Sequence, residues 1–415
     1  MIQHCGVEDE TDIGFYSGLI ESLFSVVSMC TMLPLGLLAD RFGRKPILIT
    51  SQLGIAICTV LFGLSTTVWQ MLLFRCLAGV FSGSVVAVRS MISEISTKKT
   101  QARAFSYFSV AGNIGIMLGP FIGGALATPA TQYPGVFGDN QFLRAYPYAL
   151  ANMATGAFAF SAMLLTVFFI EETLTSAVGG AKPSRPMSTW ELVKAPGVAF
   201  VLFINSMCAL IGIGYTALLT IFWYTQPALG GFGFSPLMMS IWLGVGGGAQ
   251  ALWTLLVLPP MHKRYGTIGL LRYSWSAWPV VFAGWIVGNY LLRWGQNTLF
   301  WVFTSILWIW GCSIAIGYTG AQLALNDIAP SHNTLGVLNA LAMTLGSGIR
   351  AIAPALFSSE FAVGVKYQIF GGHLAWVTLI LLSLGLRLAV EWLPEKACGR
   401  PEKPKQDNDE ETAEH

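Results

Sequence analysis

A charged pair inside apolar sequence is the first place where this chain could do chemistry. Arg75 lies inside the apolar run Val68–Val88, and Glu21 lies about two turns into the run Phe15–Leu38. An arginine near the centre of a membrane helix costs about 2.5 kcal/mol or more, so such residues usually face a cavity or a partner. A desolvated carboxyl group can bind a proton near neutrality, whereas a nearby arginine favours its ionised form. The pair predicts a proton site; the alternative is an interfacial Glu21 hydrated from outside and an Arg75 that reaches the membrane surface.

The segment Gly36–Pro46 is a charged hinge between two apolar runs. Its glycines permit close backbone approach or unusual dihedral angles, and its proline suits the first turn of a following helix. We expect Asp40 to pair with Arg44 or Arg103 and to face the amino-terminal end of the helix beginning near Gly336, whose dipole stabilises an anion by about 0.3–1 kcal/mol. The candidate hinge residues are Gly36, Asp40, Arg41, Gly43, Arg44 and Lys45.

A third motif is a stripe of small residues in the apolar run Phe105–Leu126. Glycines recur every four positions, and a proline removes a backbone donor in mid-helix. Such a helix is expected to pack closely on a neighbour and to bend. The motif consists of Gly115, Gly119, Pro120, Gly123 and Gly124.

These motifs resemble those of the major facilitator superfamily of secondary transporters. The hinge is similar to its loop signature between helices 2 and 3, Arg75 to the buried arginine of its helix 4 associated with proton coupling, and Gly115–Gly124 to its antiporter motif G-x-x-x-G-P-x-x-G-G. Residues 14–392 resemble the drug:proton antiporter group, nominally of twelve helices, and especially fungal members near the zinc-induced-facilitator-like branch. The resemblance implies two helical halves that rock around a central cavity, driven by a proton gradient and without a cofactor.

Polar and amphipathic residues inside or at the ends of apolar runs are candidates for substrate contact, because such groups tend to face the interior of a bundle. Each of them could instead be a packing or interfacial residue. Aromatic faces among them suit cationic or planar ligands. The candidates are Asn113, Asn205, Tyr215, Tyr224, Gln226, Gln250, Trp253, Asn339 and Arg350.

Composition places the whole chain in a bilayer. Of its 415 residues 54% are hydrophobic and 11% are charged, and the charges are confined to short stretches between apolar runs. We therefore expect an all-α polytopic membrane protein with the lipid bilayer, protons and a small molecule as partners. No basic, aromatic-interleaved face favours nucleic acid, and no catalytic set or metal-spaced His/Cys group is present in the sequence.

The apolar runs predict about eleven membrane helices in two halves. We expect residues 1–14 to be an exoplasmic amino-terminal remnant, 15–170 the first half (equivalent to helices 2–6), 171–196 a cytoplasmic linker, 197–392 the second half (helices 7–12) and 393–415 a disordered cytoplasmic tail. Lys and Arg cluster in alternate loops, which places the carboxyl terminus inside. A faint repeat aligns Gly266 with Gly43. The predicted spans are Phe15–Leu38, Ile47–Ser65, Val68–Val88, Phe105–Leu126, Tyr146–Ile170, Ala199–Trp223, Leu237–Leu258, Leu270–Leu292, Leu299–Leu325, Gly336–Phe357 and Tyr367–Val390.

These features predict a monomeric, proton-coupled exporter of small amphipathic organic molecules in the plasma membrane, with the vacuolar membrane as the alternative location. Two other functions stay open: uptake of small solutes by symport or uniport, against which Gly115–Gly124 argues, and a truncated, non-transporting membrane protein. The truncated, non-transporting protein is favoured by the absence of a counterpart to the family's first helix before Phe15. We expect the native reading frame to extend upstream through an apolar segment of about twenty residues.

Overall fold

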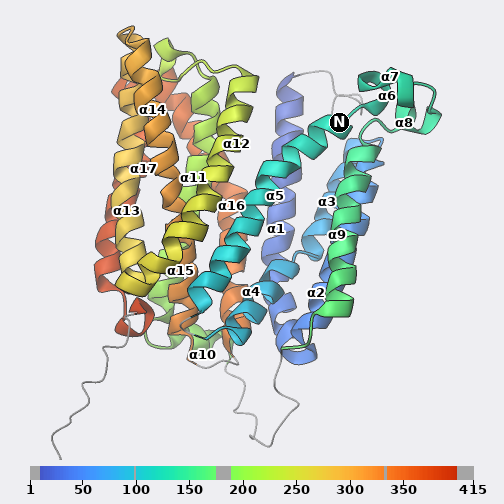
Figure 1. Ribbon diagram of the computed structural model, residues 1–415, viewed down its shortest axis with the longest axis vertical. Coiled ribbons are helices and arrows are strands. Elements are labelled where there is room, and N and C mark those ends of the chain that lie inside the picture. Colours follow the sequence, from blue (N-terminus) through green and yellow to red (C-terminus); the bar gives the residue numbers. More distant parts are fainter. Residues whose placement is uncertain (1–9, 98–99, 174–187, 331–333, 400–415) are drawn as a thin grey trace, which may run out of the picture.

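The computed structural model describes residues 10–97, 100–173, 188–330 and 334–399, and these residues form helices joined by short turns, with no strand among them (Figure 1). The expected all-α fold is confirmed. The helices before the linker are α1 (Glu10–Phe42), α2 (Arg44–Gly63), α3 (Val68–Val80), α4 (Ser84–Ile95), α5 (Gln101–Leu126), the short α6 (Pro129–Gln132), α7 (Pro134–Phe137) and α8 (Gln141–Ala145), and α9 (Ala149–Phe169). Those after it are α10 (Thr189–Lys194), α11 (Val198–Tyr224), α12 (Pro236–Leu252), α13 (Leu258–Arg293), α14 (Asn297–Gly311), α15 (Ala315–Ile328), α16 (Leu335–Lys366) and α17 (Leu374–Ala389).

Ten helical runs in the described part are long and apolar enough to cross a membrane. One of them, Met238–Arg293, has 56 residues, whereas a crossing needs about twenty. This run joins α12 and α13 through a π-helical segment, Trp253–Val257, and its backbone breaks at Gly266, where φ is 67°. It therefore has the length of two spans, and the eleven predicted spans fit these ten runs.

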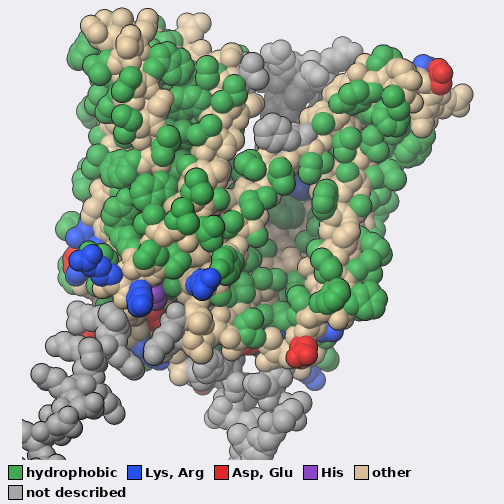
Figure 2. Space-filling model, viewed as in Figure 1, with side chains coloured by type: hydrophobic (Ala, Val, Ile, Leu, Met, Phe, Trp, Pro, Cys, Tyr) green, Lys and Arg blue, Asp and Glu red, His purple; other side chains and the backbone are tan. Residues whose placement is uncertain are grey.

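The two sets of helices meet mainly where α1 packs along α16, and α5 leans on α12 (Figure 1). Gly36 permits the first contact, because a Cβ at this position would collide with the Cβ of Ala340. A dense aromatic core fills the second set and includes Trp223, Trp285 and Trp376, all with no measurable exposure. Figure 2 shows hydrophobic side chains over the flanks, with most visible Lys and Arg near the end that carries α10. We call this end of the bundle the linker end.

The glycines of the faint repeat have matching roles. Gly43 has φ 108° and precedes α2, and Gly266 has φ 67°; both lie in backbone regions that favour glycine. A Cβ on Gly43 would meet the carboxylate of Glu172, just after α9. A Cβ on Gly266 would meet the backbone of Cys398 and Gly399, after α17. In each half, the turn before a long helix is thus covered by the chain that follows the last helix of that half.

Two of the expected irregular segments are partly ordered. Residues 393–399 of the expected disordered tail contain a 3-10 turn, Glu395–Cys398, whose Ala397 and Cys398 are buried against α13 and α15. These two apolar side chains explain the order, because they bury surface that a charged tail lacks. The segment expected to be a linker holds α10 within 171–196. Residues 1–9, 174–187 and 400–415 lie outside the described residues, and α1 begins at Glu10, before the predicted Phe15.

Candidate functional site

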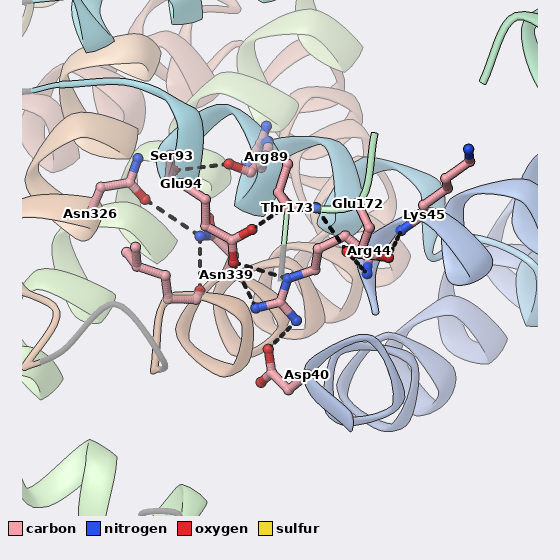
Figure 3. Close-up of polar contacts among 11 residues, drawn as sticks. Asp40, Arg44, Lys45, Arg89, Ser93, Glu94, Glu172, Thr173, Asn326 and Asn339 are labelled. Atoms are coloured by element: carbon pink, nitrogen blue, oxygen red, sulfur yellow. Dashed lines mark hydrogen bonds and ion pairs between the residues drawn. The ribbon is translucent and has the colours of Figure 1, made fainter. Parts of the chain in front are cut away.

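The hinge is built around the buried side chain of Arg44, which is only 1% exposed (Figure 3). Its Nε and Nη2 donate to Oε1 of Glu94 on α4 at 3.0 and 2.8 Å, and its Nη1 pairs with Oδ1 of Asp40 on α1. One cation therefore binds two carboxylates from different helices. Charge-assisted hydrogen bonds of this kind are about twice as strong as neutral ones, so the cluster fixes α1, α2 and α4 together.

Asp40 also reaches the second half, as predicted. Its carboxylate lies against the first turn of α16, where a Cβ on Gly336 would collide with Oδ1. The partner of Asp40 is Arg44 and not the alternative, Arg103, which donates to the hydroxyl of Tyr107 at 2.9 Å. The hinge thus links the two halves through one carboxylate at a helix amino terminus.

Glu172 completes the hinge, and sequence reasoning did not single it out. Its carboxylate accepts from the backbone amides of Arg44 at 2.8 Å and Lys45 at 3.0 Å, and so caps the first turn of α2 (Figure 3). The Nζ of Lys45 donates to the carbonyl of Val167 at 2.9 Å, which ties α2 to α9. Arg41 is exposed, and its guanidinium lies 5.4 Å from the ring centroid of Phe42. The signal for Glu172 was the acidic pair Glu171 and Glu172, directly after an apolar run at the basic end of the molecule.

The structure brings Arg75 and Glu21 together, at a distance of 2.7 Å between Nη2 and Oε2. The guanidinium of Arg75 also lies 4.8 Å from the ring centroid of Phe24, in cation-π geometry. Gly79, one turn further along α3, lies against α1, where its carbonyl accepts from the hydroxyl of Thr31 at 3.0 Å. Both charged side chains remain accessible, at 38% for Arg75 and 52% for Glu21, so the pair is open to exchange with its surroundings.

A second polar cluster joins the halves, and most of its members were missed. Arg89 on α4 donates through Nη1 to Oε1 of Gln322 on α15 at 2.7 Å. The amide of Gln322 in turn donates to Oδ1 of Asn339 at 2.7 Å and of Asn326 at 3.1 Å. Ser109 on α5 and Thr319 on α15 make a further contact between halves, at 3.2 Å. Arg89 follows a run of small residues beyond the predicted span, and only its charge near the end of that run could have revealed it.

Most other substrate candidates do not converge. Tyr215 packs among the rings of Trp278, Phe282 and Trp376 in the core of the second half, and Trp253 donates to the carbonyl of Ile309 at 2.8 Å. Tyr215 and Trp253 therefore act as packing residues of the second half. Asn339 joins the cluster around Arg89, and Arg350 is exposed on α16. The others are half-buried or exposed on separate helices or their ends: Asn113 on α5, Asn205 and Tyr224 on α11, Gln226 after α11, and Gln250 on α12.

The glycine stripe of α5 does not pack closely on a neighbour, and that prediction is wrong for the described residues. A Cβ on Gly115, Gly119, Gly123 or Gly124 would meet no atom within 4 Å. The reason is the face that α5 uses: Met117 lies against Gly247 of α12, and positions two residues apart on a helix point in opposite directions. The side chain of Pro120 is not among those that the structure describes. Figure 2 shows the surface hollowed between the middle of α5 and α9.

A cavity of about 360 Å³ lies between α1, α11 and α16. Its lining is apolar and includes Met29, Leu210, Leu345 and Ile349. Such a space suits the hydrocarbon part of a ligand, whereas the ionic groups lie in the clusters described above.

Comparison with known proteins decides the family. The profile of the Major Facilitator Superfamily matches residues 9–354. The chain belongs to this superfamily. It is therefore a multi-pass membrane transporter and not an enzyme, as the hinge and the helix pattern predict.

Relatives across this superfamily cover nearly the whole chain. It is 44% identical over 399 residues to "Efflux pump azaK" of Aspergillus niger, covering 95% of this chain and 83% of the relative. It is 27% identical to "Protein ZINC INDUCED FACILITATOR 1" of Arabidopsis thaliana, covering 94% and 85%. The crystal structure of the human organic anion transporter MFSD10 (TETRAN) superposes with a TM-score of 0.71 at 18% identity, covering 93% and 86%. The expected likeness to the zinc-induced-facilitator-like branch is confirmed.

Proposed function

We propose that this transporter exports small amphipathic organic molecules in exchange for protons, by alternating access between its two halves. Similarity to an Aspergillus protein named an efflux pump supports export. The ion pair of Glu21 and Arg75 carries the proposal of proton coupling, because it places a carboxylate and its cation within helices that cross the membrane. Membrane acids of this kind serve as proton sites in transporters.

The contacts between halves support the alternating-access part of the proposal. Asp40 lies against the first turn of α16, Arg89 donates to Gln322, and Ser109 contacts Thr319. These contacts lie towards the linker end, so this conformation is closed there. Opening that end requires Asp40 to leave the amino terminus of α16 and Arg89 to leave Gln322.

Proton binding would act on a different contact. A proton added to Oε2 of Glu21 neutralises the carboxylate and ends its ionic attraction to Arg75, so the guanidinium is free to take another acceptor. Loss of the proton restores the pair. The two protonation states thus favour different positions of α1 relative to α3, and α1 also carries Asp40 at its linker end. This continuity couples the proton site to the hinge.

The test is flux in phosphatidylcholine liposomes that contain the full chain. Two fluorescent amphipathic probes of opposite charge, dansylate (5-dimethylaminonaphthalene-1-sulfonate) and rhodamine 123, keep the outcome independent of substrate charge. We expect an imposed proton gradient to drive at least one probe in the wild type. Glu21→Gln should still exchange that probe but no longer respond to the gradient, while the exposed control Glu171→Gln should respond normally. Equal flux with and without the gradient would refute proton coupling, and no flux of either probe would refute export of this class.

A further inference from the structure

The arginines of the membrane helices fall into two groups. Four have a carboxylate partner: Arg44 with Asp40 and Glu94, Arg75 with Glu21, and both Arg272 and Arg387 with Glu391. Six others form no ion pair with any described residue: Arg41, Arg89, Arg103, Arg264, Arg293 and Arg350. Among these six, the charges of Arg89 and Arg350 repel each other. An unpaired cation inside a membrane protein is costly, and charges within membrane helices usually mark functional positions.

We propose that the transported substrate is an amphipathic organic anion whose carboxylate or sulfonate binds between Arg89 and Arg350. The inference rests on the proposed export function and names its substrate class. Arg89 lies on α4 in the first half, and Arg350 lies on α16 in the second. An anion between them would touch both halves at once, as a ligand that governs their movement must.

In the cluster around Arg89, the side-chain oxygens already accept hydrogen bonds, whereas some N–H donors have no acceptor. The Oε1 of Gln322 already accepts from Arg89, the Oδ1 of Asn339 accepts from Gln322, and the Oδ1 of Asn326 accepts from both amides. The Nε of Arg89 and the Nδ2 of Asn326 are buried and have no hydrogen-bond partner. A carboxylate or sulfonate supplies the missing acceptors together with negative charge.

The nearest acid on α4 cannot fill this role. Glu94 uses Oε1 for the two donors of Arg44 and Oε2 for the hydroxyl of Thr173, at 2.5 Å. The cluster beside Arg89 therefore consists of neutral amides. A bound anion would satisfy the charge that the protein itself leaves uncompensated.

Aromatic surface for the body of the anion lies next to Arg89. The guanidinium of Arg89 lies 5.8 Å from the ring centroid of Phe108. Cations beside apolar walls favour a molecule with a hydrophobic body and one anionic head over a small inorganic ion.

The test compares two probes that differ in charge: dansylate, which is a permanent anion, and dansylamide, which is neutral. Both are titrated by fluorescence against the purified full chain in phosphatidylcholine nanodiscs. We expect the wild type to bind dansylate about tenfold or more tightly than dansylamide, as a charge-assisted contact implies. Arg89→Gln and Arg350→Gln should each lose most of this preference without weaker binding of dansylamide. Arg89→Lys and Arg350→Lys should keep part of it, and the paired control Arg387→Gln should keep all of it.

Two results would overturn the proposal. One is equal affinity of the wild type for the two probes, or a preference that survives both glutamine variants. The other is displacement of dansylate when a tenth of the lipid is replaced by anionic phosphatidylglycerol, which would assign the site to a lipid headgroup. If Arg89→Gln fails to fold, Arg350→Gln and the two lysine variants decide. If rhodamine 123 is transported but the protein does not prefer the anionic probe, the proposed export function stands and only the proposed substrate class is refuted.

Discussion

Replacing Arg44 by glutamine should be among the most damaging single changes in the first half. The side chain is 1% exposed, and its removal leaves Asp40 and Glu94, with side-chain exposures of 19% and 12%, without their shared cation. Breaking a buried ion pair by deleting one partner costs about 3–5 kcal/mol, because the remaining charge stays buried. For a chain or half of this size, each kcal/mol lowers Tm by about 1–3 °C, so we expect a fall of roughly 3–15 °C.

The assay is thermal unfolding of the purified protein in detergent, arranged as a double-mutant cycle. Glu94→Gln alone leaves Arg44 with Asp40, and Arg44→Gln with Glu94→Gln removes one charge of each sign. The double variant should therefore be less destabilised than the sum of the two singles by about 1–3 kcal/mol. Additive effects, or a fall in Tm of under a degree for Arg44→Gln, would show that the cluster does not hold the three helices together.

Four further changes test other parts of the structure. Gly43→Ala forces a side chain onto φ 108° and should cost about 1–3 kcal/mol in thermal unfolding, whereas Gly244→Ala, with no atom within 4 Å, should not destabilise. Glu172→Ala uncaps α2 and should cost about 0.5–2 kcal/mol, against no change for its exposed neighbour Glu171→Ala; equal losses would contradict the cap. Arg75→Ala should abolish the response of flux to a proton gradient while membrane insertion persists, and Arg75→Lys should restore little, because lysine lacks the planar fork; a response that survives Arg75→Ala would exclude its role. Burial lowers the pKa of His373, its hydrogen bond to the carbonyl of Phe370 opposes this shift, and the nearby charge of Arg293 adds to it. The neutral imidazole therefore stabilises the fold fully above the ordinary pKa of about 6.5, and this stabilisation is lost as the pH falls towards the lowered pKa. His373→Phe should flatten that part of the Tm profile, and an unchanged profile would reject the assignment.

The hinge could be predicted in detail because its chemistry is local. Asp40 and Arg44 lie one helical turn apart, which puts them in reach, and Gly43 sits where a helix must restart. The family resemblance added the contact with α16. Glu172 was not predictable in the same way, because it reaches α2 from the far end of the half, and no periodicity records that distance.

The substrate-contact residues were predicted less well from the sequence than the hinge residues. Asn339 and Arg350 were found because polar residues are rare in apolar runs, but Tyr215 and Trp253 satisfied the same rule and turned out to pack or bond within the second half. An amphipathic side chain can either pack inside a helical half or face a substrate cavity, and a sequence pattern does not distinguish these two environments. The glycine motif failed for a related reason: small residues permit a close contact, but the partner decides whether one forms.

The cap on α2 also sets an order of events during synthesis. Glu172 lies 128 residues after Arg44, so the turn at Gly43 stays uncovered until the last helix of the first half has been made. At about 5–20 residues per second, this delay is roughly 6–26 s, far longer than helix formation itself. The backbone of Cys398 and Gly399 closes on Gly266 in the same manner at the end of the second half. Each half therefore completes its assembly only when its final helix has left the ribosome, and a ribosome that stalls earlier leaves a hinge that cannot yet lock.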